Sequence, residues 1–423
     1  MTKAQADSQF DIAIVGGGMV GATVACALAD TGLEIALLDG VKFDSSQVPF
    51  NQDQLKFDPK VSAITPASKQ WLQQTGAWQG ISATRISPYT NMEVWDADGT
   101  GSIRFAAKDI NEQLLGYIIE NSVILDNLYK NLEQLPQIKI FAPARVERID
   151  RLIESNRQGI KITTEDGASY LASMIIGADG PNSKIRQLAG FETREWDYQH
   201  KAIVTTVRTE RPHHSTALQR FMDSGPLAFL PLLDHPHNTT DQTGTQQHYC
   251  SIVWSVVPER SEQLMALTDE EFSRVLGESI EHKLGNIEWV DKRFTFPLRQ
   301  RHAIDYVQEG IALVGDAAHT IHPLAGQGVN LGFLDAKALS DEICSSLYRR
   351  RSLDEFSILR RYQRQRIGHN LGMMWLMEGF KLLFAEQALP LRWLRNAGMS
   401  GLDRTSVVKN HLMRQAMGIR GHS

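Results

Sequence analysis

The chain alternates between short apolar runs and segments whose apolar positions recur with helical spacing. The run from Asp11 to Val15 reads as a buried strand, the small-residue segment to about Thr31 as a helix, and 34–38 as a second strand. Strand, helix and strand in this order predict a βαβ unit in a parallel sheet. Apolar runs at 174–177 and 311–314 predict further strands buried on both faces. We therefore expect a doubly wound α/β domain.

Other segments carry apolar residues at every second position, the pattern of antiparallel strands. Residues 82–105 alternate in this way around an Asp98-Gly99 turn signal and predict a hairpin, and 191–296 predicts further strands. From Ala336 the pattern is helical. We expect an α/β (overall α+β) chain with three regions. These are a discontinuous Rossmann-like cofactor-binding domain (1–81, 106–190 and 297–345), a substrate-binding antiparallel sheet (82–105 and 191–296) and a helical C-terminal region (346–423).

Length and composition exclude several classes of protein. A chain of 423 residues is too long for a single typical hydrophobic core, so we expect more than one domain. Its 42% hydrophobic and 22% charged residues are typical of a soluble globular protein. No apolar run approaches the roughly 20 residues of a membrane span, and the polar N-terminus lacks a signal-peptide core, so we expect the cytoplasm. Cys26, Cys250 and Cys344 lie far apart without metal spacing, so we expect no metal site.

Charge is distributed unevenly along the chain. Residues 347–423 carry fourteen Lys and Arg against five Asp and Glu, a net charge of +9. Because the whole chain has a net charge of −5, the remaining residues carry −14. The apolar helix predicted within 370–384 is explained most simply by packing on the body of the protein. Together with the basic tail it also predicts peripheral contact with the inner face of a membrane. We expect no nucleic-acid partner.

The first predicted strand leads directly into Gly16, Gly18 and Gly21 with GxGxxG spacing, and the second strand ends at Asp39. Gly16 permits a tight turn, Gly18 lets the backbone approach a pyrophosphate, and Gly21 lets the helix pack on the sheet. Asp39 can accept hydrogen bonds from the adenosine ribose, and its charge disfavours a 2′-phosphate. The pattern predicts a cofactor that contains ADP.

Two later strands also end in glycine and aspartate. One leads into Gly-Ala-Asp179-Gly and then Arg186, which either holds phosphate or forms a structural clamp with Asp179. The other leads into Gly315-Asp316 and, after Pro323, the turn Ala-Gly-Gln-Gly-Val-Asn (325–330) that opens a helix. Strand ends meet at the ligand crevice of an open α/β sheet, and a helix N-terminus offers unpaired N–H groups. These parts predict a seat for a large, flat, anionic cofactor.

The three motifs in this order resemble those of the flavoprotein aromatic hydroxylases with the para-hydroxybenzoate hydroxylase fold. Within that group, five segments resemble the ubiquinone-biosynthesis ring hydroxylases, most closely the bacterial 2-polyprenylphenol hydroxylase branch. They are MEVWD (92–96), GYIIEN (116–121), WDYQH (196–200), HTIHPLAGQGVNLGF (319–333) and RQAMG (414–418). The resemblance runs over nearly the whole chain.

This resemblance implies FAD seated between the first fingerprint and the Gly315-Asp316 motif. Asp39 would bind the adenosine ribose and Asp316 the ribityl or pyrophosphate region, while the backbone of 328–330 would lie against the isoalloxazine. The family usually has Arg where this chain has Lys60, which keeps the charge but loses the planar fork. The implied cofactor-binding set is Gly16, Gly18, Gly21, Asp39, Lys60, Asp179, Gly315, Asp316, Gly326, Gly328, Val329 and Asn330.

The implied reaction is monooxygenation of a polyprenylated phenol. An external donor reduces FAD, O₂ adds to give a C4a-hydroperoxide, and the phenol attacks its distal oxygen. Because the sequence has no second GxGxxG, either NAD(P)H binds transiently or another protein delivers electrons. His319 and His322 are candidate bases, or they simply hydrogen-bond the loop. The candidate substrate-pocket residues, with ordinary sheet core as the alternative, are Phe229, Leu230, Pro231, Trp254 and Pro323.

Other functions stay open at this stage. The same motifs suit oxidation of another ring position in the same pathway, a flavin reductase or dehydrogenase of the same fold, or a non-catalytic FAD-bound subunit of a quinone-biosynthesis complex. Oxygen uptake coupled to substrate hydroxylation would separate a monooxygenase from the reductase or dehydrogenase.

Overall fold

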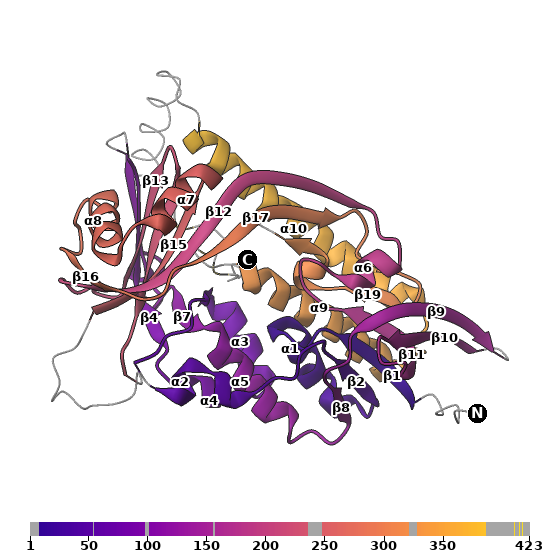
Figure 1. Cartoon of the computed structure of the whole chain (residues 1–423). Helices are drawn as coiled ribbons and strands as arrows, with labels where there is room; N and C mark the ends of the chain where they lie inside the picture. The colour runs from indigo at the N-terminus through magenta and orange to yellow at the C-terminus, as the bar shows by residue number, and fades with distance from the viewer. Residues whose placement is uncertain are drawn as a thin grey trace.

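The computed structural model describes residues 8–53, 55–97, 101–154, 157–235, 248–320 and 328–385, together with 410, 414 and 417. Figure 1 shows a Rossmann-like half, which holds the N-terminal strands, beside a half built on a large sheet that is antiparallel except for the β13–β5 pair. The mixed α/β class expected from the sequence is confirmed.

The Rossmann-like half is built on a sheet with the strand order β18-β19-β11-β1-β2-β8. Pairings from β19 through β8 are parallel, so these strands end at one edge. Ile12, Ile14 and Leu37 are fully buried, as expected for strands covered on both faces. The strands are β1 (Ser8–Val15), β2 (Ile35–Leu38), β8 (Ile138–Phe141), β9 (Val146–Glu154), β10 (Arg157–Thr164), β11 (Ser169–Gly177), β18 (Val307–Gln308) and β19 (Ile311–Leu313).

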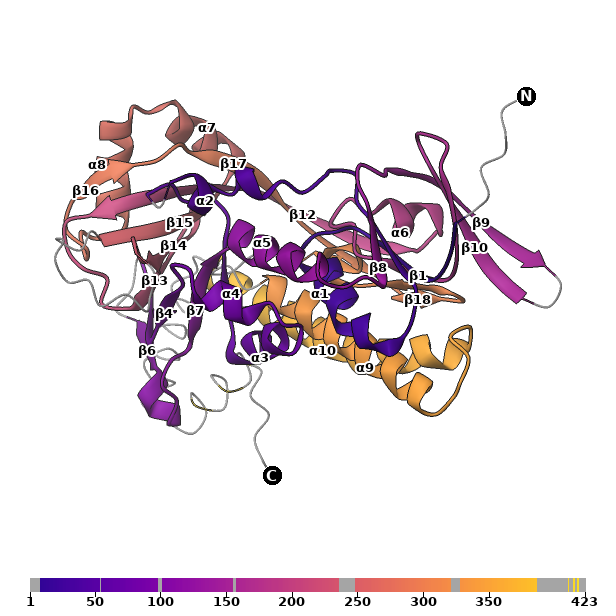
Figure 2. The same ribbon diagram turned by 90° about the horizontal axis from the view of Figure 1, so that it is seen from below.

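Helices pack on this sheet and on one another. α1 packs against both α5 and α9, and α10 packs against α9. Figure 2 shows α1, α3, α9 and α10 gathered beside the sheet, while the β9–β10 hairpin projects from the body. The α-helices of this half are α1 (Met19–Leu28), α2 (Pro49–Gln52), α3 (Pro66–Gln74), α4 (Trp78–Ser82), α5 (Asn121–Leu132), α6 (Lys184–Leu188), α9 (Gly328–Tyr348) and α10 (Phe356–Ala385).

The large sheet has the order β20-β17-β12-β15-β14-β13-β5-β6, with β16 beside β12. Helices α7 (Pro258–Ala266) and α8 (Asp269–Ser279) belong to this half, and α8 contributes to the core on one face of the sheet. The strands are β5 (Asn91–Asp96), β6 (Ser102–Ala106), β12 (Thr193–Thr209), β13 (Thr216–Met222), β14 (Gly225–Leu232), β15 (His248–Val256), β16 (Ile287–Val290), β17 (Phe294–Ala303) and β20 (His319–Thr320).

A small sheet of β3 (Val61–Ile64), β7 (Gly116–Glu120) and β4 (Ser87–Tyr89) joins the two halves. The hairpin predicted within 82–105 is present as β5 paired with β6, although its turn at 98–100 lies outside the described residues. Two boundaries differ from the sequence prediction. β4 pairs with β7 rather than with the large sheet, and the predicted boundary at residue 296 falls inside β17.

Candidate active site

The three fingerprint glycines have different physical reasons to be glycine. Gly16 has a φ of +107°, and a side chain there would overlap the carbonyl of Ala178. A side chain at Gly21 would overlap the backbone of Gly16. At Gly18 the φ is −66°, and an added Cβ would meet no described atom within 4 Å. Gly16 and Gly21 thus serve the protein's own packing, whereas Gly18 leaves open space at the start of α1 that fits a pyrophosphate.

Asp39 lies beside this open space at the end of β2. Its Oδ2 accepts a hydrogen bond from the Gly17 N–H at 2.6 Å, and its Oδ1 accepts one from the Val41 N–H at 2.8 Å. These bonds fix the orientation of the carboxylate, and a carboxylate has further lone pairs for ribose hydroxyls. The position fits the role expected from the sequence.

Asp179 is occupied with local structure. It accepts hydrogen bonds from Ser183 Oγ at 2.5 Å and from the N–H groups of Lys184 and Ile185 at 2.6 and 3.0 Å, so it caps α6. Arg186 is buried and donates to the carbonyls of Ala317 and Pro181, each at 2.8 Å. The clamp predicted between Asp179 and Arg186 thus takes another form, in which Arg186 holds two backbone carbonyls together across two turns. Contact of Asp179 with the cofactor stays a prediction.

The Gly315-Asp316 turn directly follows β19 and has the shape predicted from sequence. Gly315 has a φ of +59°, where glycine is favoured. The Asp316 side chain is exposed, but nearby protein atoms desolvate it in part, and this raises the pKa of its carboxyl. Its oxygens can accept hydrogen bonds from a ribityl hydroxyl.

Helix α9 begins at Gly328, so the N–H groups of 328–330 belong to its unpaired first turn. The Asn330 side chain is buried and bonds β3. Its Nδ2 donates to the Ala63 carbonyl at 2.8 Å, and its Oδ1 accepts from the Thr65 N–H at 3.1 Å. Asn330 therefore fixes the start of α9 and leaves only its backbone for a flavin. The Lys60 ammonium lies 4.5 Å from the centre of the Phe296 ring, which links β17 to the segment before β3.

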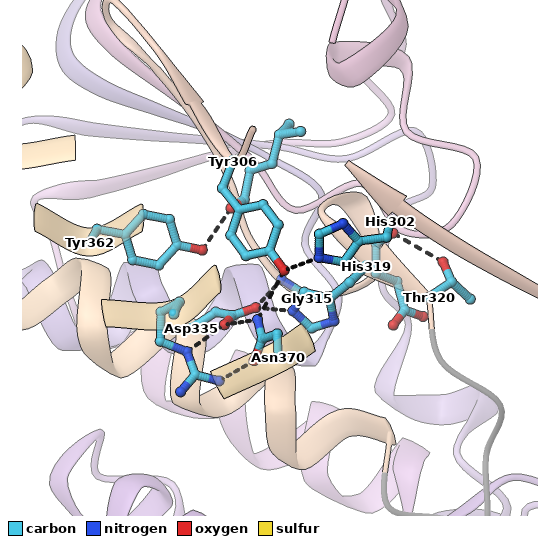
Figure 3. Close-up of polar contacts among 11 residues, drawn as sticks. His302, Tyr306, Gly315, His319, Thr320, Asp335, Tyr362 and Asn370 are labelled. Carbon is cyan, nitrogen blue, oxygen red and sulfur yellow. Dashed lines mark hydrogen bonds and ion pairs between the residues drawn. The ribbon is translucent and has the colours of Figure 1, made fainter. Parts of the chain in front are cut away.

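A buried polar network holds the Gly315-Asp316 turn in place (Figure 3). At its centre is Asp335 of α9, which accepts hydrogen bonds from the Gly315 N–H at 3.1 Å and from His319 Nε2 at 2.5 Å. Its other oxygen accepts from Arg366 Nε at 2.7 Å and Asn370 Nδ2 at 3.0 Å, both on α10. Burial alone would raise the pKa of Asp335, but the charges and hydrogen bonds of His319 and Arg366 outweigh it and hold this pKa well below its usual range.

The network continues to His302 at the end of β17. Asn370 donates to the Tyr306 hydroxyl at 3.3 Å, and that hydroxyl lies 3.0 Å from His302 Nε2 (Figure 3). Burial lowers the pKa of His302 to about 4, so its ring is neutral at pH 7 and Nε2 can accept a hydrogen bond from the Tyr306 hydroxyl. Across the β17–β20 pair, His302 is the direct partner of His319.

His319 does not face open space as a catalytic base would. Its side chain is 2% exposed and donates to ionised Asp335. The structure favours a structural role for His319, although its partner Asp335 lies on helix α9 rather than in the loop. The other candidate base, His322, lies outside the described residues, as do Pro323 and Gly326.

The predicted substrate-pocket residues are divided between two faces of the large sheet. Phe229 and Trp254 are buried against α8, and the rings of Trp254 and Phe272 lie 6.2 Å apart. Leu230 points to the opposite face, toward the small sheet. Residue alternation also places Pro231 on the α8 face. Phe229 and Trp254 are therefore corrected to core residues, and Leu230 stays a pocket candidate.

Asp335, Arg366, Asn370 and His302 were not among the predicted site residues. Asp335 had one sequence signal, since it is a lone carboxylate among the apolar and small residues of 328–339. A charge at a buried helix position needs a partner. Among the described residues, no group of three or more His, Cys, Asp or Glu has the arrangement of a metal site, and the described helices include none long and apolar enough to cross a membrane.

Comparison with known proteins supports a flavin site. A family model described as an FAD binding domain matches residues 9–370. The 3-demethoxyubiquinol 3-hydroxylase of Escherichia coli K12 is 35% identical over 412 residues, which cover 97% of this chain and 98% of that protein. The mitochondrial ubiquinone biosynthesis monooxygenase COQ6 of Xenopus tropicalis is 32% identical over 447 residues, or 96% and 92% of the two chains.

The fold is also found in solved structures. The crystal structure of p-nitrophenol 4-monooxygenase PnpA from Pseudomonas putida matches with a TM-score of 0.73 at 19% identity, covering 98% of this chain and 100% of that one. The expected fold, the FAD cofactor and the monooxygenase class are thus confirmed. The chain belongs to the FAD-dependent ubiquinone-biosynthesis hydroxylases, flavoprotein monooxygenases with the para-hydroxybenzoate hydroxylase fold.

Proposed function

We propose that this chain hydroxylates the aromatic ring of a polyprenylated phenol in ubiquinone biosynthesis, with O₂ as the oxidant. The observation that carries the proposal is the full-length similarity to proteins named as ubiquinone-pathway hydroxylases, with Gly18, Asp39 and Asp316 at one edge of the parallel sheet. Bound FAD would supply the oxygen activation.

The chain's own residues would bind and orient the cofactor. The open backbone at Gly18 and the start of α1 would hold the pyrophosphate, and Asp39 the ribose. The first turn of α9 would donate N–H groups to the flavin ring, and the Asp335 network would hold the Gly315-Asp316 turn in place. NAD(P)H binding transiently, or a protein donor, would supply electrons. A cytoplasmic location with peripheral membrane contact and membership of a quinone-biosynthesis complex belong to the same proposal.

A second candidate is oxidation at a different ring carbon. The sequence motifs resemble the 2-polyprenylphenol branch, whereas the Escherichia coli relative is named for hydroxylation of a demethoxyubiquinol. Both substrates are prenylated phenols, so the same cofactor site would serve either one.

The test is turnover of purified, FAD-loaded protein with NAD(P)H and ¹⁸O₂ on each of the two substrates. We expect one ¹⁸O atom in the ring of one product, and fragmentation by mass spectrometry would locate the carbon. Reduction of FAD and oxygen uptake without ¹⁸O in either product would contradict the hydroxylase and favour a reductase. FAD binding without any turnover would favour a non-catalytic subunit.

A further inference from the structure

A cavity of about 440 Å³ lies between the β12–β17 ribbon and α10, outside the flavin site described above. Arg194 is paired with His302 and Trp196 with Gln300 across the two strands, so all four side chains share one face. Ile367, Leu371 and Met374 line the opposite wall with helical spacing on α10. Figure 1 shows α10 running alongside β12 and β17. We call this cavity the ribbon groove.

The walls of the ribbon groove are mostly apolar and partly open to solvent, with Arg194, Gln300 and His302 as the polar residues of the strand wall. Trp196 is 49% exposed, Ile304 38% and Leu371 36%, and all three line the groove. Contact between water and several large apolar side chains at one site is unfavourable, and a bound molecule that covers them removes this cost. The volume is within the roughly 300–1,000 Å³ range of small-molecule sites.

The inner end of the groove reaches the elements of the flavin site. Met374 is buried and packs against Leu331, which lies three residues after the start of α9 at Gly328. On the opposite wall, His302 pairs with His319 across β17 and β20, close to the Asp316 turn. The outer end of the groove is therefore marked by exposed Trp196 and Leu371, and its inner end, at Met374 and His302, lies against the elements that carry the predicted flavin seat.

We propose that the ribbon groove binds the isoprenoid tail of the substrate while its ring lies at the flavin. This inference rests on the proposed function, because it assumes a prenylated phenol. A branched hydrocarbon chain suits these walls, since it needs no hydrogen-bond partners and would remove Trp196, Ile304 and Leu371 from water. The tail would then contribute to substrate affinity, while the ring chemistry stays with the cofactor site.

The test compares two substrates that share one phenol ring, one with a long polyprenyl chain and one with a single prenyl unit. In the Trp196→Ala/Leu371→Ala double variant we expect KM for the long-chain substrate to rise about tenfold, because the contact area of an indole and a leucine is lost. KM for the short-chain substrate and the FAD content should stay at wild-type values. Trp289→Ala is the matched control, since Trp289 is 38% exposed and lies on β16 away from the groove.

An equal rise in KM for both substrates, or no change for either, would overturn the assignment. So would a wild-type dimer that the double variant abolishes without altering chain-length dependence, because the groove would then be an interface between copies. Photo-crosslinking of a benzophenone-bearing isoprenoid, mapped by mass spectrometry, tests the groove without turnover. Labelling at Met374 or Leu371 supports the groove even if the protein hydroxylates neither phenol, and labelling elsewhere overturns it.

Discussion

Asp335 illustrates how much a single buried charge contributes at the residue scale. It is fully buried and ionised, and it joins the Gly315 turn to two α10 side chains, Arg366 and Asn370. Removing one member of such a cluster leaves a charge without its partner inside the protein. Asp335 thus couples the C-terminal helix to the turn that carries Asp316.

We predict that Asp335→Asn lowers the free energy of unfolding by about 3–5 kcal/mol and weakens FAD retention, because Arg366 and His319 lose the negative charge and one of the two oxygens that they bind. Urea unfolding and the flavin absorbance of the purified protein measure the two effects. Asp341→Asn on the same helix is the control. Asp341 is exposed and pairs with Lys337 at 2.8 Å, so its loss should change stability by less than about 1 kcal/mol. Equal losses in the two variants would refute the prediction.

His302 gives a prediction for pH. Its pKa is about 4 in the folded protein, and a histidine in an unfolded chain has a pKa of about 6.5. Between these values the unfolded chain binds a proton that the folded chain does not, so stability falls as pH drops through this window, by at most about 1.4 kcal/mol per pH unit. His302→Gln should lack this component of the slope. Parallel plots of unfolding free energy against pH for the two proteins would show that His302 does not titrate as described.

A substitution at Gly18 should change FAD binding without changing the stability of the fold. Because its φ is −66° and its surroundings are open, Gly18→Val should fold with a stability change within about 1 kcal/mol. The new side chain would occupy the expected pyrophosphate position, so FAD affinity should fall at least about tenfold. Titration of apoprotein with FAD, followed by fluorescence quenching, measures this. As a contrast, Gly21→Ala should destabilise the fold. Unchanged FAD affinity in Gly18→Val would mean that the pyrophosphate binds elsewhere.

At the scale of elements, the close crossing of α1 and α9 positions the start of α9. A Cβ at Gly332 would lie 2.7 Å from Val20 Cγ2 and 3.3 Å from the Gly315 backbone. We predict that Gly332→Ala destabilises the protein by about 1–3 kcal/mol, although alanine favours helices. Gly368→Ala on α10 is the matched control, because no described atom lies within 4 Å of its added Cβ, and it should stabilise by up to about 1 kcal/mol. In thermal unfolding, Tm should fall in Gly332→Ala and rise in Gly368→Ala. A shift in the same direction in both variants would contradict the close packing of α1 on α9 at Gly332.

The same scale shows what the sequence could and could not predict. The turns at Gly16 and Gly315 follow strands directly, so local pattern was sufficient to place them. Phe229 and Leu230 were predicted to line one pocket, but as neighbours in a strand they point to opposite faces, and sequence cannot tell which face of a sheet meets the cofactor domain. The Asp335 network and the ribbon groove join segments that are far apart in the chain, and only tertiary packing brings these together.

At the scale of the whole molecule, the charge asymmetry and the groove suggest a common use. Within the basic region 347–423, the tail after α10 (386–423) carries six Lys and Arg against two Asp and Glu, and α10 forms one wall of the ribbon groove. A protein that rests on an anionic membrane through this tail would have the groove wall near the layer in which a polyprenylated substrate dissolves. Membrane contact would then serve substrate entry rather than anchoring alone.

We predict that Arg392→Gln/Arg395→Gln weakens co-sedimentation with vesicles containing anionic lipid by about tenfold or more, since each basic side chain near such a surface contributes roughly 1 kcal/mol. Binding should also fall with added salt and be weak on neutral vesicles, because the attraction is screened. Arg349→Gln/Arg350→Gln removes the same charge from the exposed turn between α9 and α10 and serves as the control. If both double variants lose binding equally, net charge rather than the tail governs attachment. If neither loses it, the tail does not contact the membrane, and the substrate must reach the groove by another route.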